Sequence, residues 1–123
     1  MRNAMILAAA AVVLAAGAAN AAGDPAKGAI VFRRCAECHN ADKGGGNGLG
    51  PNLWGIAGRK AASLPDFFYS PQLRASNIVW TDAMLGKWLA GPQKVVPGTR
   101  MIFPGLTSPD DIRNLIAYLH TRK

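Results

Sequence analysis

The sequence predicts an all-α fold, with three main helices, one short helix and long connecting loops. Four segments open with helix-start signals, and no segment shows the alternating polar and apolar pattern of a half-buried strand. Residues 40–79 contain seven glycines and no long periodic segment. A small domain rarely contains such a stretch unless something other than its own secondary structure fills the space inside it.

The first two helices are predicted from proline and a capping side chain. Asp24-Pro25 combines a capping acid with proline at the first helical position, and the helical run continues through Phe32. We expect it to end near Cys35. Ser70-Pro71 predicts a short helix by the same signal.

The other two helices have equally clear starts. One begins at Thr81 and is expected to stop at Gly91-Pro92. The last begins at Ser108-Pro109, where two acidic residues follow in the first turn. Its apolar residues recur at i, i+3, i+4 and i+7, which is one helical face. They are Ile112, Leu115, Ile116 and Leu119.

The run Cys35-Ala36-Glu37-Cys38-His39 has the pattern by which a haem is attached covalently to a polypeptide. A structural zinc site would need four ligands, whereas the chain contains only two Cys and two His. A thioredoxin-type pair expects a βαβ unit, but here a helical stretch precedes the motif and a glycine-rich loop follows it. A dithiol or a simple disulfide remains the alternative to haem attachment.

Residues 1–21 have the features of a cleaved secretory signal peptide. Arg2 provides the charged start, an alanine-rich apolar run follows, and Ala19-Asn20-Ala21 fits the A-x-A cleavage pattern. An uncleaved membrane anchor would need about 20 apolar residues, usually large ones. Cleavage would leave residues 22–123 as a single domain in the periplasm, without stable membrane insertion.

The mature chain is expected to be basic. Loss of Arg2 leaves 13 basic and 7 acidic residues, a net charge of +6 before any haem propionates are counted. Such a charge favours acidic protein partners. Nucleic acid is not expected, because no helix-turn-helix, zinc-finger or aromatic RNA-binding pattern is present.

Two methionines outside the signal segment could supply a second iron ligand. Met84 lies within a helical pattern beside Leu85, which favours a packing role. Met101 lies in residues 96–103, a loop with proline and glycine that can hold extended backbone against a flat ring. Met101 is therefore the candidate ligand.

With these residues in matching order, the chain resembles the class I cytochromes c, the short soluble electron carriers of mitochondria and bacteria. The resemblance covers essentially the whole mature chain and implies the cytochrome c fold, packed around one covalently attached haem. The matching segments are Asp24 to Phe32, Cys35 to His39, Gly50 to Gly55, Pro97 to Met101 and Leu115 to Leu119, together with Tyr69 and Trp80.

The resemblance implies a haem c linked through Cys35 and Cys38, with iron held between His39 and Met101. The second N–H of His39 would donate to the Pro51 carbonyl, which orients the ring. A thioether ligand favours ferrous iron and raises the reduction potential.

Three further residues correspond to groups that bond or screen a haem propionate, namely Arg59, Tyr69 and Trp80. The alternative is that these residues do not contact a propionate: Arg59 would then be an ordinary surface charge, and Tyr69 and Trp80 would only pack in the core. Gly28 and Tyr118 match the crossing of the terminal helices, where a residue without Cβ allows close approach.

Two residues depart from the family pattern. Trp88 stands where many members carry a tyrosine whose hydroxyl approaches the methionine sulfur, and Leu73 stands where a polar amide is common. They predict a drier or differently bonded pocket around Met101, and drier surroundings raise the potential.

The implied function is one-electron transfer and not catalysis, because iron with two strong axial ligands has no open position. Expected partners are acidic-surfaced redox proteins such as a cytochrome bc-type complex, a terminal oxidase, a reaction centre or a dehydrogenase. The protein itself is expected to be a monomer. Arg34, Lys94 and Arg100 are the favoured docking charges. The alternatives are a haem enzyme or gas sensor, against which Met101 argues, and a dedicated electron-accepting subunit of one periplasmic dehydrogenase.

Overall fold

A computed structural model describes residues 8–10 and 22–123 of the chain. The predicted signal peptide, residues 1–21, therefore lies almost entirely outside the described residues. Within the described part the structure is helical, and the strand-like pairing consists of an isolated bridge between Lys60 and Val79. The helices are α1 (Pro25–Phe32), α2 (Pro71–Ala75), α3 (Asp82–Ala90), α4 (Pro92–Val95) and α5 (Pro109–His120). The all-α prediction is confirmed.

Every predicted start signal caps a helix. In each case the side-chain oxygen accepts a hydrogen bond from a backbone N–H two or three residues further on, which satisfies a donor that the helix itself leaves free. The caps and their donors are Asp24 with Ala26, Ser70 with Leu73, Thr81 with Met84, and Ser108 with Asp111.

Two helix ends differ from the sequence expectation. The first helix ends at Phe32 instead of Cys35, and the chain continues in hydrogen-bonded turns. The predicted stop at Gly91-Pro92 ends α3 but does not end helical structure. Pro92 starts α4, because proline at the first position has a suitable φ and its missing N–H would have no partner there.

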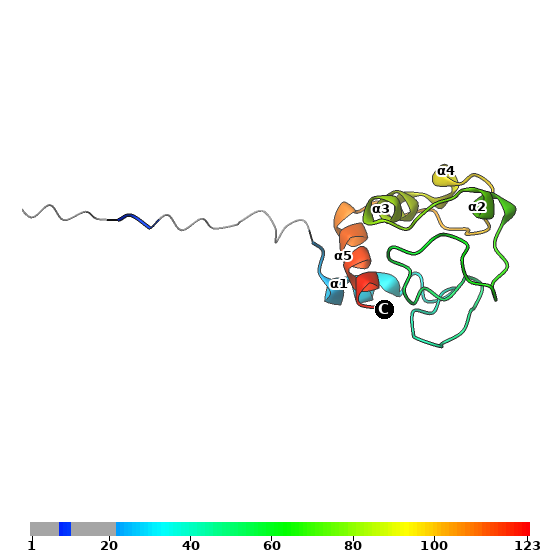
Figure 1. Cartoon of the computed structure of the whole chain (residues 1–123), viewed down its shortest axis with the longest axis horizontal. Helices are drawn as coiled ribbons and strands as arrows, with labels where there is room; N and C mark the ends of the chain where they lie inside the picture. Colours follow the sequence, from blue (N-terminus) through cyan, green and yellow to red (C-terminus); the bar gives the residue numbers. More distant parts are fainter. Residues whose placement is uncertain (1–7, 11–21) are drawn as a thin grey trace, which may run out of the picture.

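The close crossing of α1 and α5 depends on Gly28. In Figure 1 the two helices lie side by side, and a Cβ on Gly28 would stand 1.9 Å from the Asn114 carbonyl oxygen and 2.7 Å from the Tyr118 Cβ. No larger residue fits without separating the helices. The predicted role of Gly28 at this crossing is confirmed.

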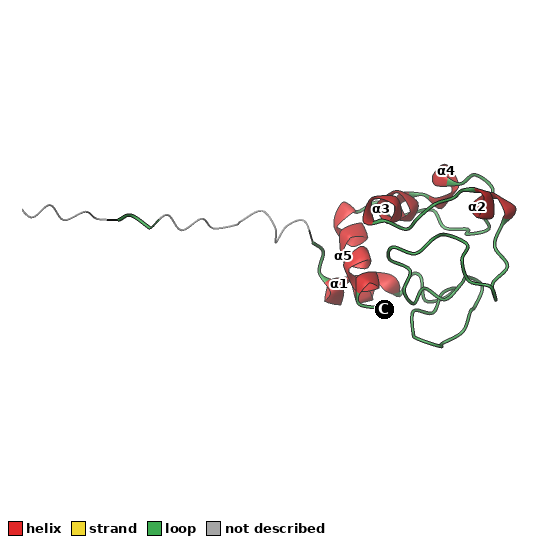
Figure 2. Cartoon of the chain, in the orientation of Figure 1, coloured by secondary structure: helices red, strands yellow, loops and turns green. Residues whose placement is uncertain are grey.

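Helix α5 packs against both α1 and α3, and α3 packs against α4. Figure 2 shows the long green loop between α1 and α2 on the side of the molecule away from α1 and α5. Helices α1, α3 and α5 contribute Val31, Leu85, Trp88, Leu89, Leu115 and Leu119 to the core, and the connecting segments contribute Ile56, Ala61, Trp80, Val96 and Leu106. None of the described helices combines the length and apolarity needed to cross a membrane.

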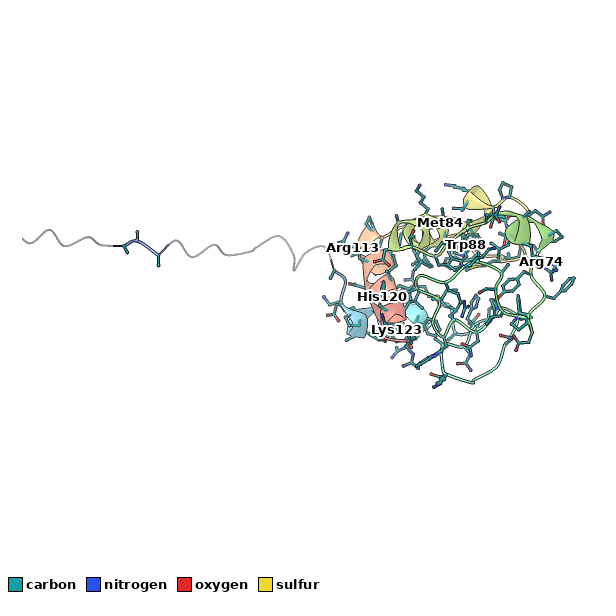
Figure 3. All side chains as sticks on the ribbon, in the orientation of Figure 1. Arg74, Met84, Trp88, Arg113, His120 and Lys123 are labelled. Carbon is teal, nitrogen blue, oxygen red and sulfur yellow. The ribbon has the colours of Figure 1, made fainter. Side chains whose placement is uncertain are left out.

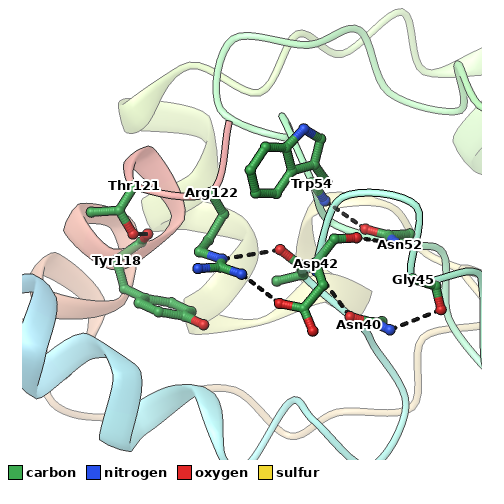
Figure 4. A network of polar contacts seen from close by, with 9 residues as sticks. Asn40, Asp42, Gly45, Asn52, Trp54, Tyr118, Thr121 and Arg122 are labelled. Atoms are coloured by element: carbon green, nitrogen blue, oxygen red, sulfur yellow. Dashed lines mark hydrogen bonds and ion pairs between the residues drawn. The ribbon is translucent and has the colours of Figure 1, made fainter.

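Arg122, just after α5, ties the C-terminal segment to the loop that follows the attachment motif (Figure 4). Its Nε–H donates to the Ala41 carbonyl oxygen at 3.0 Å, and its guanidinium pairs with the Asp42 carboxylate. The guanidinium also lies over the Trp54 ring, 5.5 Å from its centroid. The Arg122 carbonyl accepts from the Gly55 N–H at 2.7 Å, so one residue fastens two parts of the loop.

Candidate haem site

The attachment motif lies in the turns that follow α1. The N–H groups of Cys38 and His39 both donate to the Cys35 carbonyl oxygen, at 3.1 and 2.9 Å. The turn places all three of these side chains on one cavity. Burial raises the pKa of the Cys35 thiol, although the charge of Arg34 opposes the shift. A dithiol oxidoreductase needs a lowered thiol pKa, so the structure disfavours that alternative.

His39 is held in the form that can bind a metal. Its Nδ1 lies 2.7 Å from the Pro51 carbonyl oxygen. A carbonyl can only accept, so Nδ1 carries the hydrogen and Nε2 keeps its lone pair. Burial lowers the pKa of His39, although the Pro51 bond acts in the opposite direction. Gly50 stands so close that a Cβ there would lie 2.4 Å from the His39 ring, so a larger residue at position 50 would displace the imidazole.

A cavity of about 670 Å³ opens beside His39, within the range typical of small-molecule and cofactor sites. It reaches from the attachment turns to α3 and to the loop that carries Met101. Every predicted site residue contributes to its wall. These are Cys35, Cys38, His39, Pro51, Arg59, Tyr69, Trp80 and Met101.

Of the two methionines in the described part of the chain, Met101 lines this cavity and Met84 does not. Trp88 and Met84, both labelled in Figure 3, come from α3. The Trp88 indole N–H donates to the Met101 Sδ at 3.2 Å. An indole N–H therefore bonds the sulfur, and the effect of Trp88 and Leu73 on the reduction potential stays a prediction. Met84 packs partly buried against the core, as expected.

Arg59 supplies a positive charge to the cavity wall. Its guanidinium donates to the carbonyl oxygens of Trp54 at 2.8 Å and Asn52 at 3.4 Å. Its buried Nε–H has no hydrogen-bond partner among the described residues. Burial lowers the pKa of Arg59, opposed by Tyr69. A half-buried guanidinium whose buried Nε–H is a free donor is suited to a carboxylate ligand.

Two aromatic residues complete this wall. The Tyr69 hydroxyl oxygen accepts from the Leu64 N–H at 3.2 Å, so its own hydrogen remains available to donate. Trp80 packs edge to face on Trp88, with ring centroids 5.0 Å apart. Both are buried.

These residues fit a haem. The cavity has an apolar lining for the porphyrin, a neutral imidazole and a thioether for the iron, and a cationic donor for a propionate. When bound, the haem supplies one-electron cycling between ferrous and ferric iron.

Some residues at the site were not identified from the sequence. Leu73 was noted only as a departure, and it lines the cavity. The exposed Phe68, also at the wall, has the Arg100 guanidinium 4.6 Å and the Arg74 guanidinium 5.2 Å from its ring centroid. No sequence signal indicated this stack, because Arg100 lies 32 positions from Phe68 in the chain. Of the favoured docking charges, Arg34 and Arg100 line the cavity, whereas Lys94 is not among its lining residues.

An apolar cavity that joins a Cys-x-x-Cys-His turn to a loop carrying a methionine suits a c-type haem with histidine and methionine available to the iron. The family model for cytochrome c matches residues 25–123. A cytochrome c from Theileria annulata is 49% identical over 98 residues, covering 79% of this chain and 84% of its own. A cytochrome c2 from Rhodoblastus acidophilus is 46% identical over 98 residues, covering 80% of this chain and 92% of its own.

The solved structures agree. Cytochrome cH from Methylobacterium extorquens superposes with a TM-score of 0.76 at 43% identity, over 80% of this chain and 99% of that one. The chain belongs to the cytochrome c family. It is an electron carrier and not an enzyme, and it binds a covalent haem c, in agreement with its Cys-x-x-Cys-His motif.

Proposed function

We propose that the protein is a periplasmic one-electron carrier whose haem iron is held between His39 Nε2 and Met101 Sδ, with thioether links to Cys35 and Cys38. The observation that carries the proposal is that His39 and Met101, distant in sequence, line one apolar cavity. The Pro51 bond leaves Nε2 as the free lone pair, and the indole N–H of Trp88 orients the sulfur.

The polar wall of the cavity supports a propionate-binding role for Arg59, Tyr69 and Trp80. The unpartnered Nε–H of Arg59 and the free hydroxyl hydrogen of Tyr69 are both available to a carboxylate. Trp80 is placed next to Arg59 by a backbone hydrogen bond of 2.9 Å between its N–H and the Arg59 carbonyl oxygen.

The mouth of the cavity supports docking of acidic-surfaced redox proteins by a monomer. Arg34, Lys60 and Arg100 lie around it, beside the exposed apolar side chains of Leu49 and Ile102. Cationic side chains around an apolar centre favour fast, weak association with an acidic partner, which salt should weaken. A complex that survives high salt would instead indicate a permanent subunit of a dehydrogenase.

The periplasmic assignment depends on the segment 1–21. Relatives come from both bacteria and eukaryotes, so the compartment follows from the signal features and not from the family. Mass spectrometry of protein from the periplasmic fraction should find a chain that begins at Ala22 and carries one haem. A cytoplasmic protein that begins at Met1 would contradict this part of the proposal.

Visible spectroscopy of the purified holoprotein tests the ligands. We expect thioether-linked haem bands in the ferrous state and sulfur-to-iron charge-transfer absorbance in the ferric state. Met101→Ala should abolish the charge-transfer absorbance, whereas the control Met84→Ala should keep it, because Met84 packs on α3 outside the cavity lining. Colourless protein, or an unchanged Met101→Ala spectrum, would overturn the proposal.

A further inference from the structure

The loop that carries Met101 is held by the side chain of one residue from α4. Gln93 Nε2 donates to the Thr99 carbonyl oxygen at 2.7 Å and to the Met101 carbonyl oxygen at 3.3 Å. Its Oε1 accepts from the Gly98 N–H at 3.3 Å. A single carboxamide thus bonds three backbone groups within residues 98–101. We propose that Gln93 is a positioning residue for Met101, an inference that rests on Met101 being the sulfur ligand.

The loop depends on such a bond because it has little regular structure of its own. Gly98 has a φ of +89°, and residues 97–101 lie outside any helix. Within the loop, the Thr99 N–H donates to the Val96 carbonyl at 3.1 Å and the Met101 N–H donates to Thr99 Oγ1 at 3.4 Å. The long Met101 to Thr99 bond is weak. The carbonyl oxygens of Thr99 and Met101 are fixed by Gln93.

Methionine has three rotatable side-chain bonds, so the position of its sulfur depends on where its backbone is held. Met101 is fixed at both ends, since its Sδ accepts from Trp88 and its carbonyl oxygen accepts from Gln93. The first contact comes from α3 and the second from α4, which directly follows it. Together they place the thioether at the cavity wall.

The alternative is that Gln93 is an ordinary exposed side chain. Gln72 provides the comparison, because it is also an exposed glutamine beside the same loop. A Cβ built on Gly98 would lie 3.0 Å from its amide carbon. Among the described residues, however, its side chain makes no hydrogen bond to the loop. Gln93 bonds the loop, whereas Gln72 only lies beside it. Comparing substitutions at the two positions therefore distinguishes the effect of the hydrogen bonds from the effect of a nearby side chain.

The test uses the ferric holoprotein and imidazole, a neutral ligand that competes with Met101 for iron. Gln93→Ala removes all three bonds. Gln93→Glu keeps the size and the acceptor for Gly98 but has no N–H for the two carbonyl oxygens. Each lost hydrogen bond is worth about a fivefold change in an equilibrium. Exposure reduces that effect, so we expect both variants to bind imidazole about tenfold more tightly and to lose charge-transfer absorbance at about tenfold lower imidazole concentration. Gln72→Ala should match the wild type.

The outcomes separate this inference from the proposed function. Wild-type protein without charge-transfer absorbance would overturn both, because Met101 would then not be the ligand. Normal absorbance in the wild type, with unchanged imidazole affinity in Gln93→Ala and Gln93→Glu, would overturn the role of Gln93 alone. An equal effect in Gln72→Ala, or full retention of wild-type behaviour in Gln93→Glu, would show that packing and not hydrogen-bond donation holds the loop.

Discussion

Trp88→Phe should lower the reduction potential of the protein. Trp88 is 7% exposed, and its indole N–H donates to the Met101 Sδ at 3.2 Å. The positive end of this dipole points at the sulfur that we assign to the iron, so it disfavours the more charged ferric state. Phenylalanine keeps an aromatic ring but has no donor, which should make the ferric state easier to form.

The size of the effect follows from the hydrogen bond. A buried neutral hydrogen bond contributes about 1 kcal/mol. For a one-electron couple about 1.4 kcal/mol corresponds to 59 mV, so the upper limit is about 40 mV. Part of the bond energy is common to both oxidation states, and we therefore expect a decrease of about 20 to 40 mV.

Spectroelectrochemical titration measures the potential, and thermal unfolding measures the accompanying loss of packing. The smaller ring leaves space beside Trp80 and should cost about 1 to 3 kcal/mol. Leu89→Ala is the control, because it opens space on the same helix without removing a donor, and its potential should change less. An unchanged potential in Trp88→Phe, with normal charge-transfer absorbance, would refute the reasoning. So would an equal decrease in Leu89→Ala.

Two further predictions concern the pocket and the helix crossing. Leu73→Asn should lower the reduction potential in the same titration, because a polar amide at the cavity wall favours the ferric state, and a higher potential would contradict this. Gly28→Ala should reduce the free energy of unfolding by about 1 to 3 kcal/mol, because its Cβ would meet the Asn114 carbonyl, as thermal or denaturant unfolding would detect. The control Gly86→Ala, where a Cβ meets nothing within 4 Å, should instead add about 0.5 to 1 kcal/mol; similar losses in both variants would show that the crossing is not the cause.

Sequence reasoning succeeded where the signal is local. The cap residues Asp24, Ser70, Thr81 and Ser108 act within three residues of themselves, so a short stretch of sequence contains both partners. The attachment motif is equally local. Met101 was singled out by its proline- and glycine-bearing loop, and its role as the second iron ligand stays a prediction.

It failed where a contact depends on the fold. Nothing in the sequence around Gln93 indicates that its amide bonds the backbone several residues later, because the partners are main-chain groups that every residue carries. The pairing of Arg122 with the Ala41 and Asp42 region also joins residues about 80 positions apart. The sequence did not show whether the Trp88 indole N–H reaches the Met101 sulfur. The packing of α3 against the loop that carries Met101 shows that it does.

The arginine pair around Phe68 has a consequence for the thermodynamics of encounter. A free arginine side chain loses up to about 2 kcal/mol of rotamer entropy when a complex immobilises it. Stacking on Phe68, together with the 3.0 Å hydrogen bond from Arg100 to the Phe68 carbonyl oxygen, already restricts these side chains in the isolated molecule. A partner that meets them loses less conformational freedom on contact. The side chains of Arg74 and Arg100 are thus preorganised for contact with an acidic surface.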